Sequence, residues 1–214
     1  MFPTRDLDGK TLGEVVSLFH DSYREGDEAH LRRSLDKLRF IATARSRDGL
    51  AGFALGEMRV MDLPRLAAQT VALAGVCCIA SPFRRSGLFR TLGQRAISAG
   101  DVENPGRVLH CGRVAHPASF RTMTWNPTHV PKRSVPPTPW QREIGAAIAA
   151  AYGVRHFDPE TFVCIGNGRP IGYPLMDIEV EPEEWEVFAS VDRGRGDALL
   201  GFFWMPDAPE GWMR

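Results

Sequence analysis

The sequence lacks long apolar runs. None of its segments approaches the ~20 consecutive apolar residues that a membrane-spanning helix needs. The first six residues, MFPTRD, also lack the apolar core of a secretory signal. We therefore expect no membrane partner and a cytoplasmic location for this protein.

The chain also lacks an excess of either charge. Its 26 Lys and Arg residues balance 26 Asp and Glu residues, so the formal net charge is zero. Proteins that bind nucleic acid or anionic membranes usually carry a basic excess, and we therefore expect neither partner. The chain is 43% hydrophobic and 24% charged, which is typical of a globular protein with a sizeable core. Its length suits one domain of about 150–200 residues with an elaboration.

Cysteine is scarce, and its spacing excludes the commonest metal and disulfide motifs. The four cysteines, Cys77, Cys78, Cys111 and Cys164, form no CxxC pair. If the adjacent pair lies in a strand, its two side chains point to opposite faces. We therefore expect buried thiols rather than a zinc site or a disulfide framework. This cysteine usage again favours the cytoplasm, and we expect no metal cofactor.

In the first 125 residues, segments with helical periodicity give way to strand-like ones. Thr11 and Glu14 form a predicted capping box on the first helix, and Arg47-Asp48-Gly49 is a hairpin-type turn. The predicted elements are, in order, helix 11–24, a helix from 27, strands 39–45, 50–60 and 70–80, helix 87–100, strand 107–114 and helix 116–123.

This order of elements predicts the fold class. Three consecutive strands with short connections should be antiparallel, whereas the strand–helix–strand unit at 70–114 should form a parallel, right-handed crossover. The expected fold is therefore α+β (α/β). Its mixed central sheet is mostly antiparallel, contains one parallel crossover and is flanked by helices.

The last part of the chain differs in composition. Five prolines in residues 125–139 exclude regular helix and central strand, so this segment is either a lid or a strap over the surface. Thr138, Pro139 and Gln141 then begin a helix that runs to residue 152. Further strands are predicted at 162–165, 185–191 and 198–205. We expect 1–125 to form the core and 126–214 to complete the same domain.

Residues 77–89 suggest a binding site, because an apolar strand ends in a basic turn and an amphipathic helix follows at once. A helix N-terminus presents unpaired N–H groups and a partial positive charge, which suit a phosphate or pyrophosphate group. Gly87 lets the backbone approach such a group, and Arg84, Arg85 and Arg90 supply a positive field. The plainer alternative is a solvated helix start, although three cations there oppose the macrodipole unless an anion binds.

Residues 5–125 resemble the GCN5-related N-acetyltransferase (GNAT) superfamily in element order and in one motif. Arg84-x-x-Gly87-x-Phe89 is similar to the family's [QR]-x-x-G-x-[GA] loop, and Gly52-Phe53-Ala54 is similar to a triplet common in its third strand. The resemblance implies acetyl-CoA as the co-substrate, bound largely by backbone amides. The implied contacts to the thioester and pantetheine arm are Cys77, Cys78 and Ile79. The implied contacts to the pyrophosphate are Arg85, Ser86, Gly87, Leu88, Phe89 and Arg90.

The sequence departs from the family pattern in three places. Phe89 stands where the family has Gly or Ala, a change that leaves the backbone amide in place. The strand at 70–80 has no carboxylate where the family often places its general base. His116 and Met123 stand where the resemblance leads one to expect an Asn and a Tyr that acts as general acid. The acid is therefore missing and the base is unassigned.

Several residues are candidates for the missing chemistry. His110 and His116 lie nearest the predicted cleft, and either could take a proton from an amine or be a hydrogen-bonded structural residue. Glu57 and Asp62, toward the far end of the strand at 50–60, could be a base, bind the amine or simply be solvated. Ser119 is either a contact to the CoA arm or an N-terminal cap residue of its helix.

A second segment, Arg193-Gly194-Arg195-Gly196-Asp197-Ala198, fits the bare motif better than the first. Only residues 199–214 follow it, too few for the helix and strand that the motif requires next. We therefore predict a turn at 192–197 rather than a cofactor loop.

Together these features predict an acyl-CoA-dependent N-acetyltransferase. An acetyl group would pass by direct attack to an amine of a small-molecule or peptide acceptor, with amides near Cys78 and Ile79 holding the oxyanion. The missing acid and base support an alternative, a GNAT-like module that binds CoA or another ligand as a sensor without chemistry. The sequence does not identify the acceptor, and a homodimer is compatible with it.

Overall fold

The chain folds into two compact units. The computed structural model describes residues 1–100, 102–103, 105–176 and 178–213. The first unit comprises Met1–Arg59, Ala72–Asp101 and Ile171–Leu175, and the second comprises Val60–Val71, Val102–Pro170 and Met176–Arg214. Strands β4 (Gly49–Leu63) and β5 (Leu66–Ile79) each contribute residues to both units.

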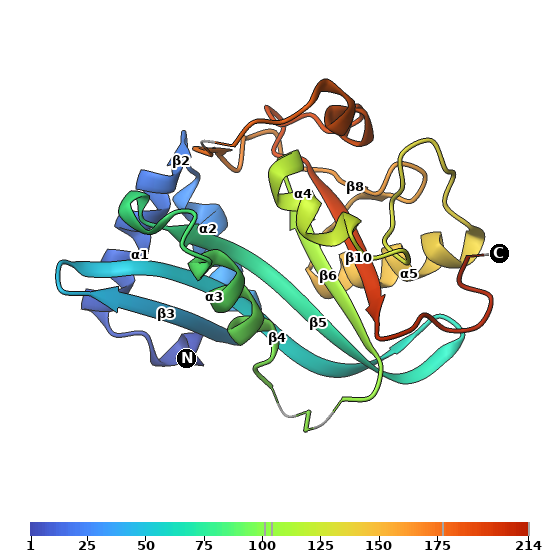
Figure 1. Cartoon of the computed structure of the whole chain (residues 1–214), viewed down its shortest axis with the longest axis horizontal. Helices are drawn as coiled ribbons and strands as arrows, with labels where there is room; N and C mark the ends of the chain where they lie inside the picture. The colour runs from blue at the N-terminus through green and yellow to red at the C-terminus, as the bar shows by residue number, and fades with distance from the viewer. Residues whose placement is uncertain (101, 104, 177, 214) are drawn as a thin grey trace. The chain divides into compact units, whose positions relative to one another are not determined.

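The first unit combines three helices with the N-terminal strands (Figure 1). Strand β3 pairs antiparallel with both β1 and β4, and its register with β4 shifts between Ala44 and Arg45. The predicted turn at Arg47 and Asp48 joins β3 to β4. The elements besides β4 and β5 are β1 (Phe2–Pro3), η1 (Thr4–Asp6), α1 (Gly9–Ser22), α2 (Glu28–Lys37), β3 (Phe40–Ser46), η2 (Ser81–Phe83) and α3 (Leu88–Ile97).

Helix α3 packs closely on the strands of this unit because the contact residues are small. A Cβ placed at Gly56 would lie 3.0 Å from the carbonyl carbon of Ala96, so the strand and helix backbones nearly touch. The buried cluster between them consists of Ala42, Ala54, Ile79, Leu92 and Ala96. This packing fixes the end of β5 relative to the start of α3.

A separate two-stranded sheet joins distant parts of the sequence within the first unit. Strand β2 (Tyr23–Arg24) pairs antiparallel with β9 (Tyr173–Pro174). The amide of Asp27 donates to the Ile171 carbonyl at 3.0 Å, and the amide of Leu175 donates to the Ser22 carbonyl at 2.8 Å. We call residues 22–27 and 171–175 together the clasp.

The second unit is built around strand β10 (Ala198–Met205), which pairs antiparallel with β6 (Val108–Val114) and with β8 (Val163–Cys164). Its core is aromatic, and Trp204, Trp212, Phe162 and Phe202 are fully buried. The remaining elements are α4 (Pro117–Thr124), α5 (Pro139–Ala151), β7 (Phe157–Asp158) and η3 (Pro182–Phe188).

The strand order confirms the fold class predicted from the sequence. The eight-stranded sheet has the order β1-β3-β4-β5-β6-β10-β8-β7. It is mostly antiparallel, contains one parallel pair, β5 with β6, and is flanked by helices. In the described part of the chain, no helix has the length and apolar character of a membrane span.

Two local predictions are wrong. The cap of α1 is Asp8 rather than Thr11, because the helix begins at Gly9 and the Asp8 carboxylate accepts a hydrogen bond from the Thr11 amide at 2.6 Å. The predicted strand at 185–191 is instead largely the 3-10 helix η3 and the turn after it. A proline at its first position and a capping box between Glu181 and Glu184 begin that helix.

Candidate functional site

The loop after β5 has a backbone that favours an anion. Residues 81–83 form the short helix η2, after which Arg85 has φ +63° and Gly87 has φ +82°. The Ser86 hydroxyl donates to the Phe83 carbonyl at 2.6 Å and holds this turn. Turns with such residues can aim neighbouring N–H groups toward one side, the arrangement called a nest. Gly87 is suited to its position because a left-handed φ costs other residues about 1–2 kcal/mol.

Helix α3 begins directly at this turn. Its first hydrogen bond runs from the Thr91 amide to the Gly87 carbonyl at 3.1 Å, so the amides of Leu88, Phe89 and Arg90 precede the helical ladder. A Cβ placed at Gly87 would meet no atom within 4 Å, and residues 85–87 are exposed. The loop therefore offers open space in front of amides that the helix leaves unbonded.

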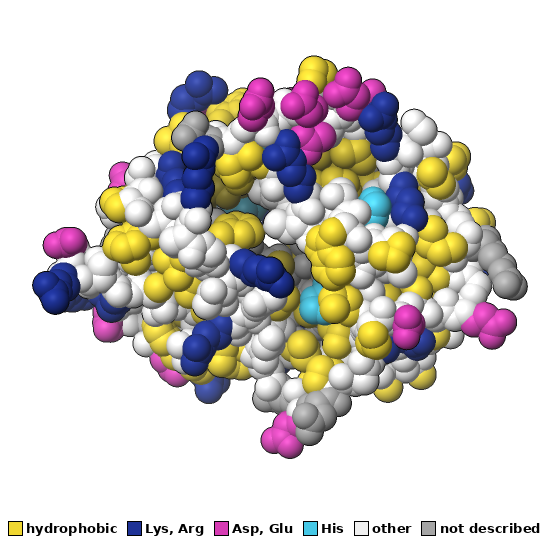
Figure 2. All heavy atoms as spheres, viewed as in Figure 1, with side chains coloured by type: hydrophobic (Ala, Val, Ile, Leu, Met, Phe, Trp, Pro, Cys, Tyr) yellow, Lys and Arg dark blue, Asp and Glu magenta, His cyan; other side chains and the backbone are white. Residues whose placement is uncertain are grey.

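The three arginines of the loop have different roles. Arg84 is half-buried, and its Nε donates to the Ile79 carbonyl at 3.2 Å, so it organises the end of β5. Arg85 and Arg90 are exposed. Figure 2 shows Lys and Arg side chains over the part of the surface that carries α3. Because residues 77–90 contain no Asp or Glu, no carboxylate of the loop itself neutralises this charge.

The cysteines at the end of β5 are packing residues rather than nucleophiles. Cys78 is buried, and burial raises the pKa of its thiol to about 12, although Ser22 and Arg84 act in the opposite direction. Burial also raises the pKa of the half-buried Cys77 well above its ordinary value. All four cysteines are thiols, and Cys111 and Cys164 are buried. Thiols that stay protonated at neutral pH suit the packing interpretation.

Glu57 is buried and engaged in ion pairs. The side chain is only 1% exposed on β4, and its carboxylate accepts from the Arg39 Nε at 3.0 Å. The Arg59 guanidinium lies 3.1 Å from the other carboxylate oxygen. The carboxylate is already engaged by two cations, so this geometry favours a structural role. Asp62 is also engaged, because it accepts from the Ala68 amide at 2.8 Å and closes the β4–β5 turn.

His116 is the N-cap of α4, in the second unit. Its Nδ1 accepts from the Ala118 amide at 3.2 Å, which puts the proton of the neutral ring on Nε2. Burial lowers the pKa of His116, and the charges of Arg193 and Arg121 add to this against the opposing Glu184. The ring is therefore neutral at pH 7, and its one lone pair is used by the cap.

His110, on β6 of the same unit, has a different environment. Its ring stacks on Phe203 with centroids 5.1 Å apart and planes 10° apart, and it makes no hydrogen bond within the described residues. Burial lowers the pKa of His110, which keeps the ring neutral at pH 7. Of the two histidines, His110 is the one that retains a lone pair for a proton.

Ser119 does not cap its helix, because His116 has that position. Ser119 lies in the first turn of α4 and its amide donates to the His116 carbonyl at 3.0 Å. The loop and Glu57 belong to the first unit, whereas His110, His116 and Ser119 belong to the second. The structure thus places the predicted cofactor loop in the first unit and the two candidate histidines in the second.

The rival motif at 193–198 is a turn that supplies its own anion. The Asp197 carboxylate is 1% exposed and accepts from the amides of Gly166 at 2.8 Å and Asp192 at 3.0 Å. Arg195 Nε donates to the same carboxylate at 2.9 Å. The strand β10 follows it rather than a helix. The prediction of a turn is therefore confirmed.

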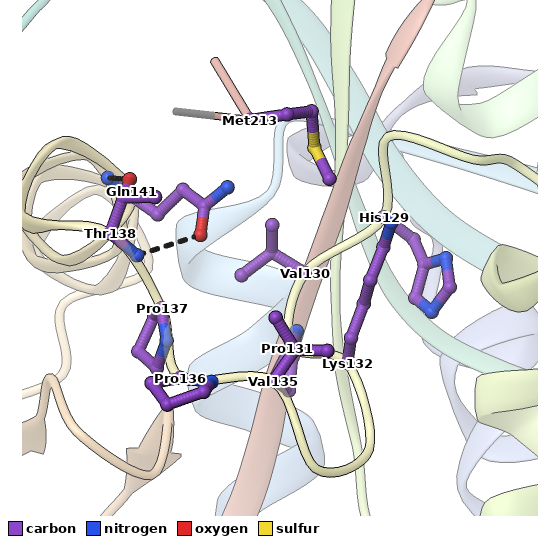
Figure 3. Close-up of a pocket in the computed structure, with 10 residues that line it drawn as sticks. All are labelled: His129, Val130, Pro131, Lys132, Val135, Pro136, Pro137, Thr138, Gln141 and Met213. Atoms are coloured by element: carbon purple, nitrogen blue, oxygen red, sulfur yellow. Dashed lines mark hydrogen bonds between the residues drawn. The ribbon is translucent and has the colours of Figure 1, made fainter.

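The proline-rich segment is a fixed strap rather than a lid. Val130 forms an antiparallel bridge with Phe202, with both N–H···O distances at 2.9 Å, and the Asn126 side chain donates to the Trp204 carbonyl at 3.1 Å. A small pocket lies between residues 129–132 and 135–138, Gln141 and Met213 (Figure 3). Its walls are mainly Pro, Val and Met, and the Gln141 side chain bonds to the Thr138 amide and the Trp212 carbonyl. His129 and Lys132 also line it, but His129 Nδ1 lies 2.7 Å from the Asn126 carbonyl and Lys132 Nζ donates to the Pro127 carbonyl at 2.6 Å, so both already contact the backbone.

Sequence reasoning missed Tyr23. Its side chain belongs to the first unit and is half-buried. Its ring stacks on Phe19 of α1, and its backbone pairs with β9, about 150 residues away in the sequence. No local pattern around Tyr23 signals that pairing.

No protein-family model and no curated protein matches the chain, but a comparison with solved structures found partial similarities. Chaetomium thermophilum Naa20 in complex with a bisubstrate analogue is 14% identical, with a TM-score of 0.44, and the match covers 92% of this chain and 83% of that one. The ribosomal-protein-S18-alanine N-acetyltransferase from Escherichia coli is 12% identical, with a TM-score of 0.37 and coverages of 96% and 94%.

A third neighbour is the GNAT-like decarboxylase GphF in complex with isobutyryl-CoA. It is 12% identical, with a TM-score of 0.41, and the match covers 92% of this chain and 96% of that one. At such identities the similarity concerns the fold alone, so activity must be argued from this chain's own residues. Within the described residues, no group of three His, Cys, Asp or Glu could hold a metal ion.

Proposed function

We propose that this protein is an acyl-CoA-dependent acyltransferase that moves an acetyl group from acetyl-CoA to an amine. The observation that carries the proposal is the loop between β5 and α3. Two left-handed residues, Arg85 and Gly87, turn the backbone there, and three helix amides follow without ladder partners. An exposed cation stands at each end of this series, Arg85 and Arg90.

The residues present fit a CoA pyrophosphate. A Cβ added at Gly87 would have no atom within 4 Å, which leaves room for phosphate oxygens against the backbone. The amides of Ser86, Gly87, Leu88, Phe89 and Arg90 are the proposed donors, with Arg85 completing the set. Phe89 is 43% exposed, and its side chain points outward while its amide belongs to the first turn. The motif departure at this position therefore leaves the proposed donor in place.

The thioester end of the substrate is assigned to the last residues of β5. Cys77, Cys78 and Ile79 are fixed by the Arg84 bond to the Ile79 carbonyl and by the packing of α3. When bound, acetyl-CoA supplies an activated acyl group. The protein supplies orientation and amide donors for the developing oxyanion. His110 is the proposed base, since its ring is neutral and makes no hydrogen bond within the described residues.

The acceptor is proposed to be an amine on a small molecule or a peptide. The acceptor amine must lose a proton before or during attack, which requires a base with a pKa near the working pH. The proposal places the protein in the cytoplasm and is compatible with a homodimer.

Calorimetry with CoA and a thiol-release assay with acetyl-CoA and a panel of amines test the proposal. Wild type should bind CoA saturably and release thiol only when an amine is present. Arg85→Ala and Arg90→Ala should each weaken CoA binding about two- to tenfold, because each removes one charge at a helix N-terminus. Arg95→Ala is the matched control, since Arg95 is an exposed cation in the last turn of α3. Equal affinities for all four proteins, or no binding at all, would overturn the proposal.

One alternative has a specific observation in its favour. Glu57 is bound by two arginines and His116 uses its lone pair as a cap, which leaves few groups for proton transfer. A sensor that binds CoA without turnover explains this. It predicts the same loss of binding for Arg85→Ala, but no thiol release with any amine.

A further inference from the structure

One face of strands β6 and β10 is covered by α4 where two glycines meet, and carries aromatic rings just beyond. Gly201 pairs with Gly112, and a Cβ at Gly201 would lie 2.7 Å from the Met123 sulfur, so α4 packs directly on the backbone there. Phe203 pairs with His110, two residues further along β10. Because alternate residues of a strand share a face, this second pair lies on the same face as α4.

Trp125 ends α4 beside this pair and is fixed there, although most of it faces solvent. Its Nε1 donates to the Thr122 carbonyl at 2.8 Å, and its ring contacts Phe203 with centroids 5.7 Å apart and planes 65° apart. Trp125 is nevertheless 64% exposed, whereas Trp204 and Trp212 of the same unit are fully buried. A tryptophan that is held on one side and exposed on the other is typical of a binding surface.

His110 gives this aromatic surface a group that can accept a proton. Its ring stacks on Phe203 with centroids 5.1 Å apart, and its nitrogens form no hydrogen bond within the described residues. Phe203 thus contacts both His110 and Trp125. Figure 2 shows exposed hydrophobic side chains over the part of the surface that carries β6 and β10. An amine at His110 would therefore have an aromatic surface beside it.

The segments that form this surface carry no negative charge. Residues 107–135 and 198–206 contain no Asp or Glu. Glu184 reaches α4 from η3, but its carboxylate is engaged by Arg121. A second positive charge on an acceptor would thus find no carboxylate on these segments, whereas an apolar ring would bury surface against Trp125. The charge distribution favours an acceptor whose amine is attached to an apolar group.

We propose that Trp125 binds the acceptor, and that the acceptor carries an aromatic ring close to its amine. The inference rests on the proposed function, which assigns His110 as the base. The ring of the acceptor packs on the exposed surface of Trp125, and this contact directs the amine toward His110. Trp125 takes no part in the bond changes of the transfer, and its role is to select the acceptor.

Phenethylamine and ethylamine test this inference, because they share the amine and differ by the ring. Wild type should bind phenethylamine at least about tenfold more tightly in calorimetry, since its ring buries apolar surface. The same preference should appear in kcat/KM for thiol release from acetyl-CoA. Trp125→Ala should reduce both preferences about two- to twelvefold, the value of one aromatic contact.

Two further variants serve as controls. Trp125→Phe keeps an aromatic ring and should retain most of the preference for phenethylamine. Val135→Ala should keep the wild-type preference, because Val135 is an exposed apolar residue elsewhere in the same unit. A loss in Val135→Ala equal to that in Trp125→Ala would count against a specific role for Trp125.

The outcomes separate this inference from the proposed function. Thiol release without a preference for phenethylamine, or with a preference that Trp125→Ala leaves unchanged, would overturn the inference and leave the proposed function intact. Binding of phenethylamine that depends on Trp125, with no thiol release from any amine, would support the aromatic site and overturn the transfer reaction. A wild-type protein that neither binds nor acetylates phenethylamine would overturn the inference. The wild-type preference needs no variant, so the test does not depend on the folding of Trp125→Ala.

Discussion

Two loops of this molecule share one sequence pattern and differ in what they do. Arg84–Phe89 and Arg193–Ala198 both place an arginine three residues before a glycine. The second loop contains Asp197, whose buried carboxylate bonds to the amides of Gly166 and Asp192 and to Arg195. The first loop contains no acidic residue and opens into a helix. Such a pattern thus produces a turn whose backbone amides can bind an anion. The neighbouring residues decide whether that anion is a side chain of the protein, as with Asp197, or a bound ligand.

The largest expected effect comes from removing the internal anion. Asp197→Asn should lower the free energy of unfolding by about 2 kcal/mol, because several donors lose a charged, buried acceptor. We expect the lower part of the usual range since the Arg195 side chain is 43% exposed and regains water. Chemical denaturation measures the change, and CoA affinity should not alter. Asp207→Asn, at an exposed aspartate of the same unit, is the control.

The comparison fails if Asp197→Asn leaves stability unchanged, since the second loop would then need no anion. The comparison of the two loops would be strengthened if added phosphate stabilised Asp197→Asn. That result would show that a phosphate ion replaces the missing Asp197 carboxylate.

The next effect concerns the glycine of the first loop. Gly87→Val should destabilise the fold by about 1–2 kcal/mol, because valine must adopt φ +82°. It should also weaken CoA binding at least about tenfold, since a shift of the loop backbone disperses its amides. Gly93→Ala is the control, because Gly93 lies in α3 with no atom within 4 Å of a Cβ. Alanine there should be neutral or stabilise by about 0.5–1 kcal/mol.

A Gly87→Val protein with normal CoA affinity would contradict the assignment of the loop. If it loses affinity at unchanged thermal stability, the loop binds ligand without contributing to the fold.

The fold was predictable where local patterns and long-range packing agree. The apolar run of β5, the periodic face of α3 and the capping box of α5 all appear at nearly the expected residues. The segment 185–191 was not predictable, since Trp185, Glu186 and Val187 alternate apolar and polar residues as in a strand. Its geometry follows from Pro182 and from the ion pair that Glu184 makes with Arg121, 63 residues away.

For the candidate site, only the backbone conformation of the loop was predictable from the sequence. A glycine in a basic turn before a helix is a local signal, and the structure gives it the expected left-handed φ. The side-chain contacts of the site were not predictable, because they join residues that no local sequence pattern connects. The pairing of Glu57 with Arg39 and Arg59, and the clasp around Tyr23, both join residues that the fold alone brings together.

The smallest expected effect is a pH dependence that separates the two loops. Burial alone would raise the pKa of Asp197, but hydrogen bonds from Arg195, Gly166 and Asp192 hold it below its ordinary value. A carboxylate with a lowered folded-state pKa contributes stability that is complete above its unfolded pKa of about 3.9. That contribution disappears as the pH falls through the lower folded-state value. The stability difference between wild type and Asp197→Asn should therefore be constant from pH 7 to about pH 5 and narrow below about pH 4. Denaturation curves at several pH values measure this stability difference.

Because the first loop has no carboxylate, the stability difference between wild type and Gly87→Val should stay constant over the same pH range. If both differences narrow together, the acid effect is general and the two loops do not differ in this respect.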